Sequence, residues 1–221
     1  MQTKRGKRAG STLMFVTFRQ CTLDPVLNRR HHRNKFYFYF FIIPMELFLG
    51  AMYVGKTAHA LKRGRDYRDS GKRVVFAKSK IDNRYATDRI ATHDGDTEPA
   101  IAVESISQLL GMQHVIEADM LVLDEAQFFA DLLDLRKLPH SVLVVVAGVP
   151  YTSARKPFGR LLELEPFATR VERLTGKCQF CGAPGAEHTA SIVKKEGDVL
   201  VAGSSVYRLA CDTCHAKNSV N

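Results

Sequence analysis

Two short stretches carry residue types that could bind phosphate and activate a hydroxyl group. The first, GAMYVGKT at residues 50–57, has two glycines followed by lysine and threonine. Between a strand and a helix, such a loop turns successive backbone N–H groups toward an anion, and the helix adds its positive N-terminal end. We predict that Lys56 reaches the β- and γ-phosphates of a nucleotide and that Thr57 offers its hydroxyl to Mg²⁺. The predicted phosphate-binding residues of the loop are Gly50, Ala51, Met52, Tyr53, Val54, Gly55, Lys56 and Thr57.

The second stretch, LVLDEAQFF at residues 121–129, places two carboxylates at the end of an apolar run. Asp124 then lies at the carboxyl edge of a strand, where open α/β sheets bind ligands. We predict that Asp124 helps Thr57 to hold Mg²⁺ through bound water or another ligand of the ion rather than by direct contact. Glu125 points to the other side and is the candidate general base for an incoming hydroxyl. The alternative for Glu125 is a carboxylate that interacts only with a helix dipole.

Four of the five cysteines form two C-x-x-C pairs near the C-terminus. Cys178 and Cys181 are separated from Cys211 and Cys214 by 29 residues, and the fifth cysteine is Cys21. This spacing predicts a zinc site in a reducing cytoplasm rather than a disulfide framework. Four thiolates leave no open coordination position, so the predicted role of the zinc is structural.

The elements that must position these residues alternate along the chain after residue 44. Predicted strands cover residues 46–49, 73–77, 120–123 and 142–147, and predicted helices cover 57–67, 104–110, 129–135 and 158–164. This alternation is typical of an α/β fold in which helices flank a parallel sheet. After residue 174 the chain changes to cysteines, glycines and short alternating segments at 191–195, 199–201 and 207–210. We therefore predict a domain at 45–174 and a small β-rich domain at 175–221.

The basic charge of the chain is concentrated in its first 44 residues. They hold nine Lys or Arg and one acid, Asp24, which accounts for +8 of the net charge of +9. Because the rest is nearly neutral, we expect no nucleic-acid partner. The apolar run at 36–43 is too short for a membrane span and lacks a cleavage site, so we expect a cytoplasmic protein with no membrane partner. We interpret residues 1–44 as a disordered extension, or as sequence upstream of a start at Met45. Contact of this basic tail with RNA, DNA or acidic lipid is the alternative.

Together these stretches resemble the type II, cellular-type thymidine kinases, from about residue 46 to residue 214. The resemblance is carried by FLGAMYVGKT, DNRY at 82–85, THDG at 92–95, DEAQFF at 124–129, ARKPFG at 154–159 and C-x-x-C…Y…C-x-x-C at 178–214. It implies a P-loop, RecA-like core with a zinc-binding lid. It also implies transfer of the γ-phosphate of ATP to the 5′-hydroxyl of thymidine, with Glu125 as proton acceptor, in nucleotide salvage for DNA synthesis. A homo-tetramer or homo-dimer is implied as well.

The resemblance implies further site residues. It places Asp82, Asn83, Arg84 and Gln127 near the phosphates, and it implies a lid that closes on the base largely through main-chain groups. The residues implied to contact the nucleoside are Phe128, Ser153, Asp198, Val199, Leu200, Val201, Ala202 and Tyr207.

Three positions depart from the family pattern. Pro150 stands where the family has an acid, Ser153 replaces an aromatic residue, and Ser191 stands where the family has arginine, two residues after a retained threonine. All three lie at the nucleoside end, so we predict a looser base preference that includes deoxyuridine beside thymidine.

Two other interpretations of the same motifs remain open. One is a nucleotide-binding relic of the family, against which the retention of Lys56, Thr57, Asp124 and Glu125 argues. The other is a helicase-like ATPase, because GKT and DEAQ also resemble helicase motifs. A helicase needs a second lobe and a basic groove, whereas 75 residues follow Val146 and they hold the paired cysteines.

Overall fold

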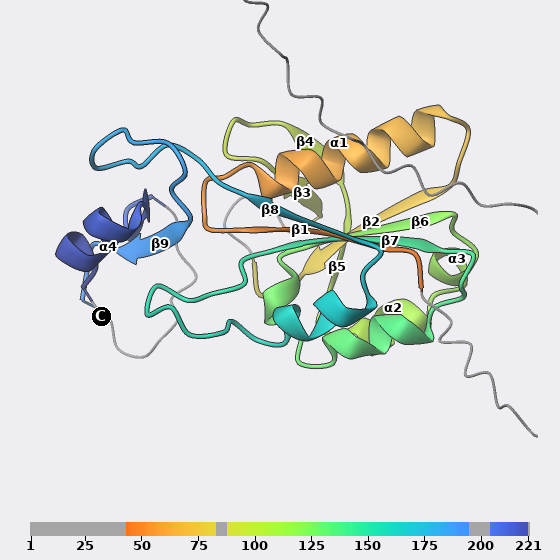
Figure 1. Cartoon of the computed structure of the whole chain (residues 1–221). Coiled ribbons are helices and arrows are strands. Elements are labelled where there is room, and N and C mark those ends of the chain that lie inside the picture. Colours follow the sequence, from red (N-terminus) through yellow and green to blue (C-terminus); the bar gives the residue numbers. More distant parts are fainter. Residues whose placement is uncertain (1–42, 83–87, 195–203, 221) are drawn as a thin grey trace, which may run out of the picture. The chain divides into compact units, whose positions relative to one another are not determined.

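Six parallel strands form the central sheet (Figure 1). The computed structural model describes residues 43–82, 88–194 and 204–220, all within one unit, Phe40–Asn221. The strand order is β5-β2-β6-β7-β1-β8, and each neighbouring pair is parallel. The strands are β1 (Met45–Gly50), β2 (Val74–Ser79), β5 (Ile101–Val103), β6 (Met120–Asp124), β7 (Leu143–Gly148) and β8 (Arg170–Leu174). The predicted parallel α/β sheet is confirmed.

The four predicted strands correspond to β1, β2, β6 and β7, the strands of the sheet's interior. Residues of β6 and β7 are almost all buried, as their apolar runs predict. The two edge strands were not predicted. β5 has three residues, and β8 reads RVERL with mostly exposed or half-buried side chains. A strand at a sheet edge needs little apolar surface, so its sequence carries a weak signal.

Helix α1 (Lys56–Asp69) covers one face of the sheet, and shorter helices cover the other (Figure 1). The shorter ones are α2 (Ile106–Leu110), α3 (Gln113–Ile116) and the 3₁₀ helices η1 (Ala126–Phe128), η2 (Leu132–Lys137) and η3 (Leu161–Phe167). On the α1 face, Phe76, Val122 and Val145 pack with Ala60 and Leu61.

Two of the predicted α-helices were wrong in type, and a third is confirmed but begins later than predicted. The helix predicted at 104–110 begins at Ile106, because Ser105 caps it by accepting a hydrogen bond from the Gln108 amide at 3.3 Å. The segment predicted as a helix at 129–135 overlaps the 3₁₀ helix η2. The segment predicted as a helix at 158–164 overlaps the 3₁₀ helix η3. Asp131 accepts hydrogen bonds from the amides of α2, which holds the chain ahead of η2. Pro166 lies inside η3 and cannot donate an α-helical hydrogen bond.

A small hairpin of β3 (Arg89–Ala91) and β4 (Thr97–Pro99) is fastened to α1 by ion pairs. Arg65 contacts Asp96 at 2.7 Å and Glu98 at 2.8 Å, and Arg68 also contacts Glu98. The hairpin, whose turn is formed by residues 92–96, is thereby fastened to the second half of α1.

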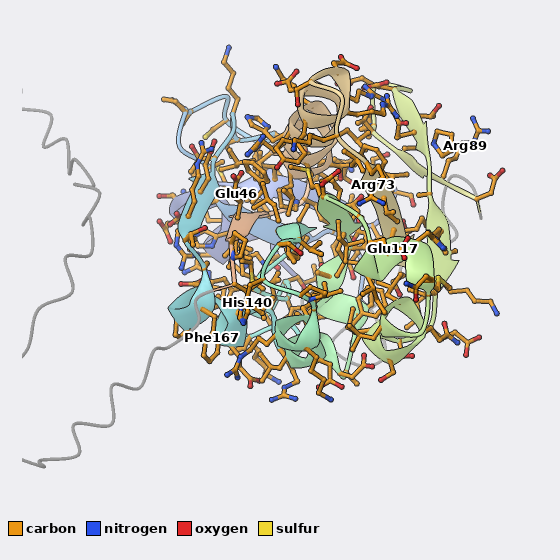
Figure 2. All side chains as sticks on the ribbon, turned by 90° about the vertical axis from the view of Figure 1, so that its right-hand side faces the viewer. Glu46, Arg73, Arg89, Glu117, His140 and Phe167 are labelled. Carbon is orange, nitrogen blue, oxygen red and sulfur yellow. The ribbon has the colours of Figure 1, made fainter. Side chains whose placement is uncertain are left out.

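The end of the sheet where the strands begin carries charged side chains, seen face-on in Figure 2. There the Glu46 carboxylate of β1 accepts two hydrogen bonds from Arg63 of α1, each 2.9 Å long. These bonds fasten α1 to the end of the sheet where the strands begin. The opposite end, where the strands finish, carries the candidate site described below.

The C-terminal module consists of β9 (His188–Ser191), β10 (Tyr207–Ala210) and α4 (Asp212–Asn218), with β9 and β10 antiparallel. The predicted strand at 207–210 is confirmed. The strand predicted at 191–195 was wrong, because the strand in the structure runs from His188 to Ser191. The chain turns after Ser191, whose hydroxyl donates a hydrogen bond to the Val193 carbonyl at 2.9 Å. The segment 199–201 lies outside the described residues. No helix in the described ranges is long and apolar enough to cross a membrane.

Candidate active site

A cavity of about 360 Å³ lies beyond the carboxyl ends of β1, β6 and β7, a size typical of small-molecule sites. Its wall combines the loop after β1, the start of α1, the residues after β6, the loop after β7, the hairpin turn and the C-terminal module. Carboxyl ends of parallel strands are the usual ligand-binding edge of an open sheet.

The glycine-rich loop divides into residues that line the cavity and residues that support it. Met52, Tyr53 and Gly55 line it together with Lys56 and Thr57, where α1 begins. Gly55 has φ +82°, a left-handed conformation that glycine adopts readily. Lys56 donates a hydrogen bond to the Ala51 carbonyl at 2.7 Å.

The remaining loop residues, Gly50, Ala51 and Val54, pack away from the cavity. A Cβ at Gly50 would lie 2.6 Å from the Leu174 carbonyl oxygen of β8, so only glycine permits this close approach. Ala51 and Val54 contact Cys178 and neighbouring residues of the C-terminal module. This module therefore packs against the side of the glycine-rich loop that faces away from the cavity.

Asp124 and Thr57 face each other at the predicted magnesium position. The Thr57 hydroxyl lies 3.1 Å and 3.3 Å from the two Asp124 carboxylate oxygens. Burial, and then the adjacent Glu125 carboxylate, raise the pKa of Asp124 to about 7. A buried carboxylate beside a hydroxyl, open to the cavity, suits Mg²⁺, which binds through one or two carboxylates and substrate phosphates.

Replacing Asp124 by asparagine should stabilise the nucleotide- and magnesium-free protein at alkaline pH. Because the pKa of Asp124 is raised on folding, its contribution to stability is present at low pH and is lost as the pH rises from about 4 to about 7. Asparagine stays neutral, so at pH 8 the free energy of unfolding should increase by up to about 4 kcal/mol, a gain that shrinks toward pH 4. Urea denaturation at several pH values measures this.

The matched control is Asp131→Asn. Burial opposes ionisation of Asp131, but hydrogen bonds from Ile106 and Ser107 outweigh it and lower its pKa. Its stabilising effect is therefore lost as the pH falls, and Asp131→Asn should destabilise the protein at neutral pH. A pH-independent difference for Asp124→Asn would contradict the buried-charge explanation.

Glu125 lines the cavity next to Asp124 and is held by Gln127. Glu125 has φ +52°, an unusual left-handed conformation for a non-glycine residue. The Gln127 amide donates to the Glu125 carboxylate, while its carbonyl oxygen accepts from the Val149 amide at 3.0 Å. Gln127 thus lies beside the candidate base, and its predicted contact with phosphate stays a prediction.

Gly159 allows the chain to pass directly beneath Gln127. It has φ +59°, and a Cβ there would lie 2.2 Å from the Gln127 carbonyl oxygen. Gly159→Ala should lower the free energy of unfolding by about 2–4 kcal/mol and reduce activity, because Gln127 must shift. Gly71 also has a positive φ, +86°, but faces open space, so Gly71→Ala should cost only about 1 kcal/mol. Equal losses, measured by chemical denaturation, would rule out the clash.

Aromatic side chains form the wall beyond Glu125. Phe128 and Phe158 meet edge to face with centroids 5.4 Å apart, and both line the cavity. Tyr207 of β10 and Ser153 of the loop after β7 are buried and also line it. Three of the predicted nucleoside-binding residues, Phe128, Ser153 and Tyr207, therefore line one cavity. The other five, residues 198–202, lie outside the described part of the chain.

Asp82 is a buried carboxylate at the edge of the same cavity. The buried Lys78 ammonium lies 3.7 Å from it and also contacts the Arg89 carbonyl. Asn83 and Arg84, predicted with Asp82, are outside the described residues. His93 and Asp94 of the hairpin turn also line the cavity, and His93 meets Tyr53 edge to face.

The four paired cysteines converge in the C-terminal module. The Sγ atoms of Cys178, Cys181, Cys211 and Cys214 all lie within 4.8 Å of one another, and those of Cys181 and Cys211 are 3.8 Å apart. A tetrahedral zinc with bonds of about 2.3 Å requires sulfurs about 3.8 Å apart. Burial opposes ionisation of Cys178, but hydrogen bonds from the Cys211 and Cys181 amides outweigh it and lower its pKa to about 6. The cluster therefore suits a structural zinc.

Polar contacts join this module to the loop after β7. The buried His215 ring hydrogen-bonds through Nε2 to the Ser153 carbonyl at 2.9 Å, and burial lowers the pKa of His215, which favours the neutral ring. Arg155 contacts Asp212 at 3.0 Å, and His188 contacts the same carboxylate at 3.0 Å. The loop is thus held between the cavity and the cysteine cluster.

Several cavity-lining residues were not predicted: Tyr151, Thr152, Gln179 and Thr189. They come from loops and a strand that are distant in sequence. Thr189 was noted only as a residue kept from the family pattern; its hydroxyl accepts a hydrogen bond from the Met52 amide at 3.0 Å. Two of the three residues that depart from the family pattern, Pro150 and Ser191, remain to be placed. Pro150 is buried beside the cavity wall. Ser191 is buried within β9 and bonded there to Val193 and Ser219.

The parallel sheet, the glycine–lysine–threonine loop after β1 and the acidic pair after β6 define a P-loop nucleotide-binding α/β protein. A family model described as thymidine kinase matches residues 43–215, so the chain belongs to the thymidine kinase family. A thymidine kinase of Oryza sativa subsp. japonica is 34% identical over 174 residues, 76% of this chain and 64% of that protein.

Two further relatives agree with this family. Thymidine kinase a of Arabidopsis thaliana is 32% identical over 186 residues, 80% of this chain and 76% of that protein. A thymidine kinase of Pseudothermotoga lettingae is 30% identical over 177 residues, 78% of this chain and 95% of that protein. The chain spans less than two thirds of the rice relative and nearly the whole of the bacterial one.

Proposed function

We propose that this protein transfers the γ-phosphate of ATP to the 5′-hydroxyl of thymidine, giving thymidine monophosphate and ADP. The observation that carries the proposal is the single cavity that joins Lys56, Thr57 and Asp124 to Glu125 and to the aromatic wall. A phosphate site and an apolar nucleoside site must share one cavity for direct transfer, and the family membership supports this pairing.

Each end of the cavity has a role in the proposed reaction. The amides of the loop and the start of α1 bind the triphosphate, and Lys56 turns from the Ala51 carbonyl to the β- and γ-phosphates. Thr57 and Asp124 hold Mg²⁺, which when bound neutralises charge on the phosphate oxygens. Glu125, oriented by Gln127, accepts the proton of the 5′-hydroxyl as the new O–P bond forms. Asp82, Asn83 and Arg84 act near the phosphates.

The nucleoside end supports a relaxed choice of base. Phe128 and Tyr207 line the wall, while the small Ser153 stands where the family has an aromatic side chain. We propose that deoxyuridine is accepted beside thymidine and that residues 198–202 close on the base. The four cysteines hold zinc and keep this lid in place.

The proposed setting follows from the same reaction. Thymidine monophosphate is a precursor of DNA, so the reaction fits nucleotide salvage. Four thiolates require a reducing compartment, which supports the cytoplasm. We propose a homo-dimer or homo-tetramer, with thymidine and ATP as the partners of the site and with no nucleic acid or membrane partner.

Transfer of radiolabel from γ-³²P-ATP to thymidine, with and without a magnesium chelator, tests the proposal. We expect labelled thymidine monophosphate that disappears with the chelator. ATP binding without transfer would identify a non-catalytic relic, and ATP hydrolysis stimulated by nucleic acid would identify a helicase-like ATPase. Comparing kcat/KM for thymidine and deoxyuridine tests the base preference, and strict use of thymidine would contradict it.

A further inference from the structure

The turn of the β3–β4 hairpin, residues 92–96, forms one wall of the main cavity. Thr92, His93 and Asp94 all line that cavity. Two hydrogen bonds close the turn: the Thr92 amide donates to the Asp96 carbonyl at 2.8 Å, and the Asp96 amide donates to the Thr92 hydroxyl at 3.0 Å. The Asp96 carboxylate is also paired with Arg65 of α1. These contacts fix the turn that carries His93 against α1.

His93 lies beside the glycine-rich loop. Its ring meets the ring of Tyr53 edge to face, with centroids 5.6 Å apart. Tyr53 is in the middle of the loop at residues 50–57 and also lines the cavity. It has φ +70°, a left-handed conformation that costs free energy for a tyrosine and that is found most often at functional sites. The ring contact therefore places His93 at the loop where the proposed function puts the phosphates.

Neither ring nitrogen of His93 makes a hydrogen bond to another of the described residues. The Asp94 carboxylate lies 3.9 Å from Nδ1, which is longer than a hydrogen bond. By contrast, the other ring-bonded histidines each have a nitrogen 2.9–3.0 Å from an oxygen, and they are His59, His188 and His215. The His93 side chain retains 62% of its solvent exposure. A ligand that enters the cavity can therefore accept a hydrogen bond from this ring.

A triphosphate needs more positive charge than the described cavity wall supplies. Four carboxylates line the cavity: Asp82, Asp94, Asp124 and Glu125. Among the lining residues of the described ranges, Lys56 is the only lysine or arginine, and Arg84 lies outside those ranges. An imidazole donates an N–H to a phosphate oxygen and becomes a cation when it is protonated. His93 is thus the side chain of the described wall that can assist Lys56 with a phosphate.

We propose that His93 is a phosphate-binding residue of the phosphoryl-donor site, where its ring N–H donates a hydrogen bond to an oxygen of the terminal phosphates. The Tyr53 ring orients the imidazole, and the hairpin carries it at a fixed place beside the loop. This inference rests on the proposed function and deepens it by adding a side chain of the hairpin to the donor site. The reaction is unchanged: the phosphoryl group passes from ATP to the 5′-oxygen, ADP leaves, and Glu125 takes the proton.

Two variants separate hydrogen bonding by His93 from packing of its ring. His93→Phe keeps a ring for the contact with Tyr53 but removes both nitrogen atoms, whereas His93→Gln keeps an N–H donor but removes the ring. We expect His93→Phe to weaken the binding of magnesium–ATP by at least about tenfold in a calorimetric titration, with thymidine binding unchanged. His93→Gln should weaken ATP binding less than His93→Phe does. Because the side chain is mostly exposed, both variants should keep the Tm of the unaltered protein.

His114→Phe is the matched control, since His114 is an exposed histidine of α3 that does not line the cavity, and it should change neither affinity. If His93 only packed against Tyr53, ATP binding would be normal in His93→Phe and weaker in His93→Gln. That order, equal losses in the two variants, or an equal loss of thymidine affinity would overturn the inference, as would unchanged ATP binding in His93→Phe.

The same titration keeps this inference separate from the proposed function, because ATP binding is measured without phosphate transfer. If the unaltered protein binds ATP but does not phosphorylate thymidine, the proposed function fails and the comparison of His93→Phe with His93→Gln still decides the role of His93. An unaltered protein that does not bind magnesium–ATP would overturn both.

Discussion

Glu125→Gln should lower kcat for phosphate transfer to thymidine by about 10²–10⁴-fold while leaving the affinity for ATP unchanged. Glutamine has nearly the same shape as glutamate and can still pair with the Gln127 amide, but it cannot accept the hydroxyl proton. The carboxylate lies in the cavity beside Asp124, at a backbone conformation that is strained for a side chain. Strain kept at a cavity-lining carboxylate supports a functional position.

Steady-state kinetics and ATP titration together measure this effect. Gln127→Leu is the companion variant, since it leaves the carboxylate but removes the group that orients it. We expect a smaller loss of kcat than in Glu125→Gln, with both variants folded. Turnover near that of the unaltered protein in Glu125→Gln would exclude Glu125 as the base and leave it as a carboxylate near a helix start.

Removing zinc should weaken ATP binding and phosphate transfer by disturbing the glycine-rich loop, although no cysteine lines the cavity of the described structure. The cysteine cluster packs against Ala51 and Val54, and Thr189 of β9 holds the Met52 amide. Structural zinc supplies on the order of 10 kcal/mol to the folding of small domains. Without it the two-strand module cannot hold itself together. Chelation, or Cys211→Ser, should therefore weaken ATP binding and transfer by at least about tenfold.

Elemental analysis should find one zinc per chain, and differential scanning calorimetry should show a lower Tm after chelation that added zinc restores. Cys21→Ser is the control: Cys21 belongs to neither C-x-x-C pair, so zinc content and activity should not change. Full activity after chelation would show that the site does not depend on the bound metal.

The sequence predicted those elements whose signals are local. The signals for β6, β7 and the loop after β1 are apolar runs and a glycine pattern, each only a few residues long. They were sufficient to predict the interior strands of the sheet and the glycine-rich loop. The C-x-x-C spacing likewise predicted that four thiols meet, and the structure brings their Sγ atoms together.

The parts that sequence reasoning missed depend on contacts between distant segments. Strand β8 has few apolar residues and is defined by its parallel pairing with β1, to which Gly50 allows a close approach at one end. Thr152 and Thr189 line the same cavity because the loop after β7 folds against the C-terminal module.

The loop after β7 has the cavity on one side and α4 on the other, joined by the bonds of His215 to the Ser153 carbonyl and of Arg155 to Asp212. Under the proposed function, amino-acid changes at residues 150–155 that alter base selection must therefore be compatible with the surface that α4 presents. Substrate choice and metal-dependent folding should evolve together, and libraries built to redesign selectivity should vary Asp212 and His215 along with this loop.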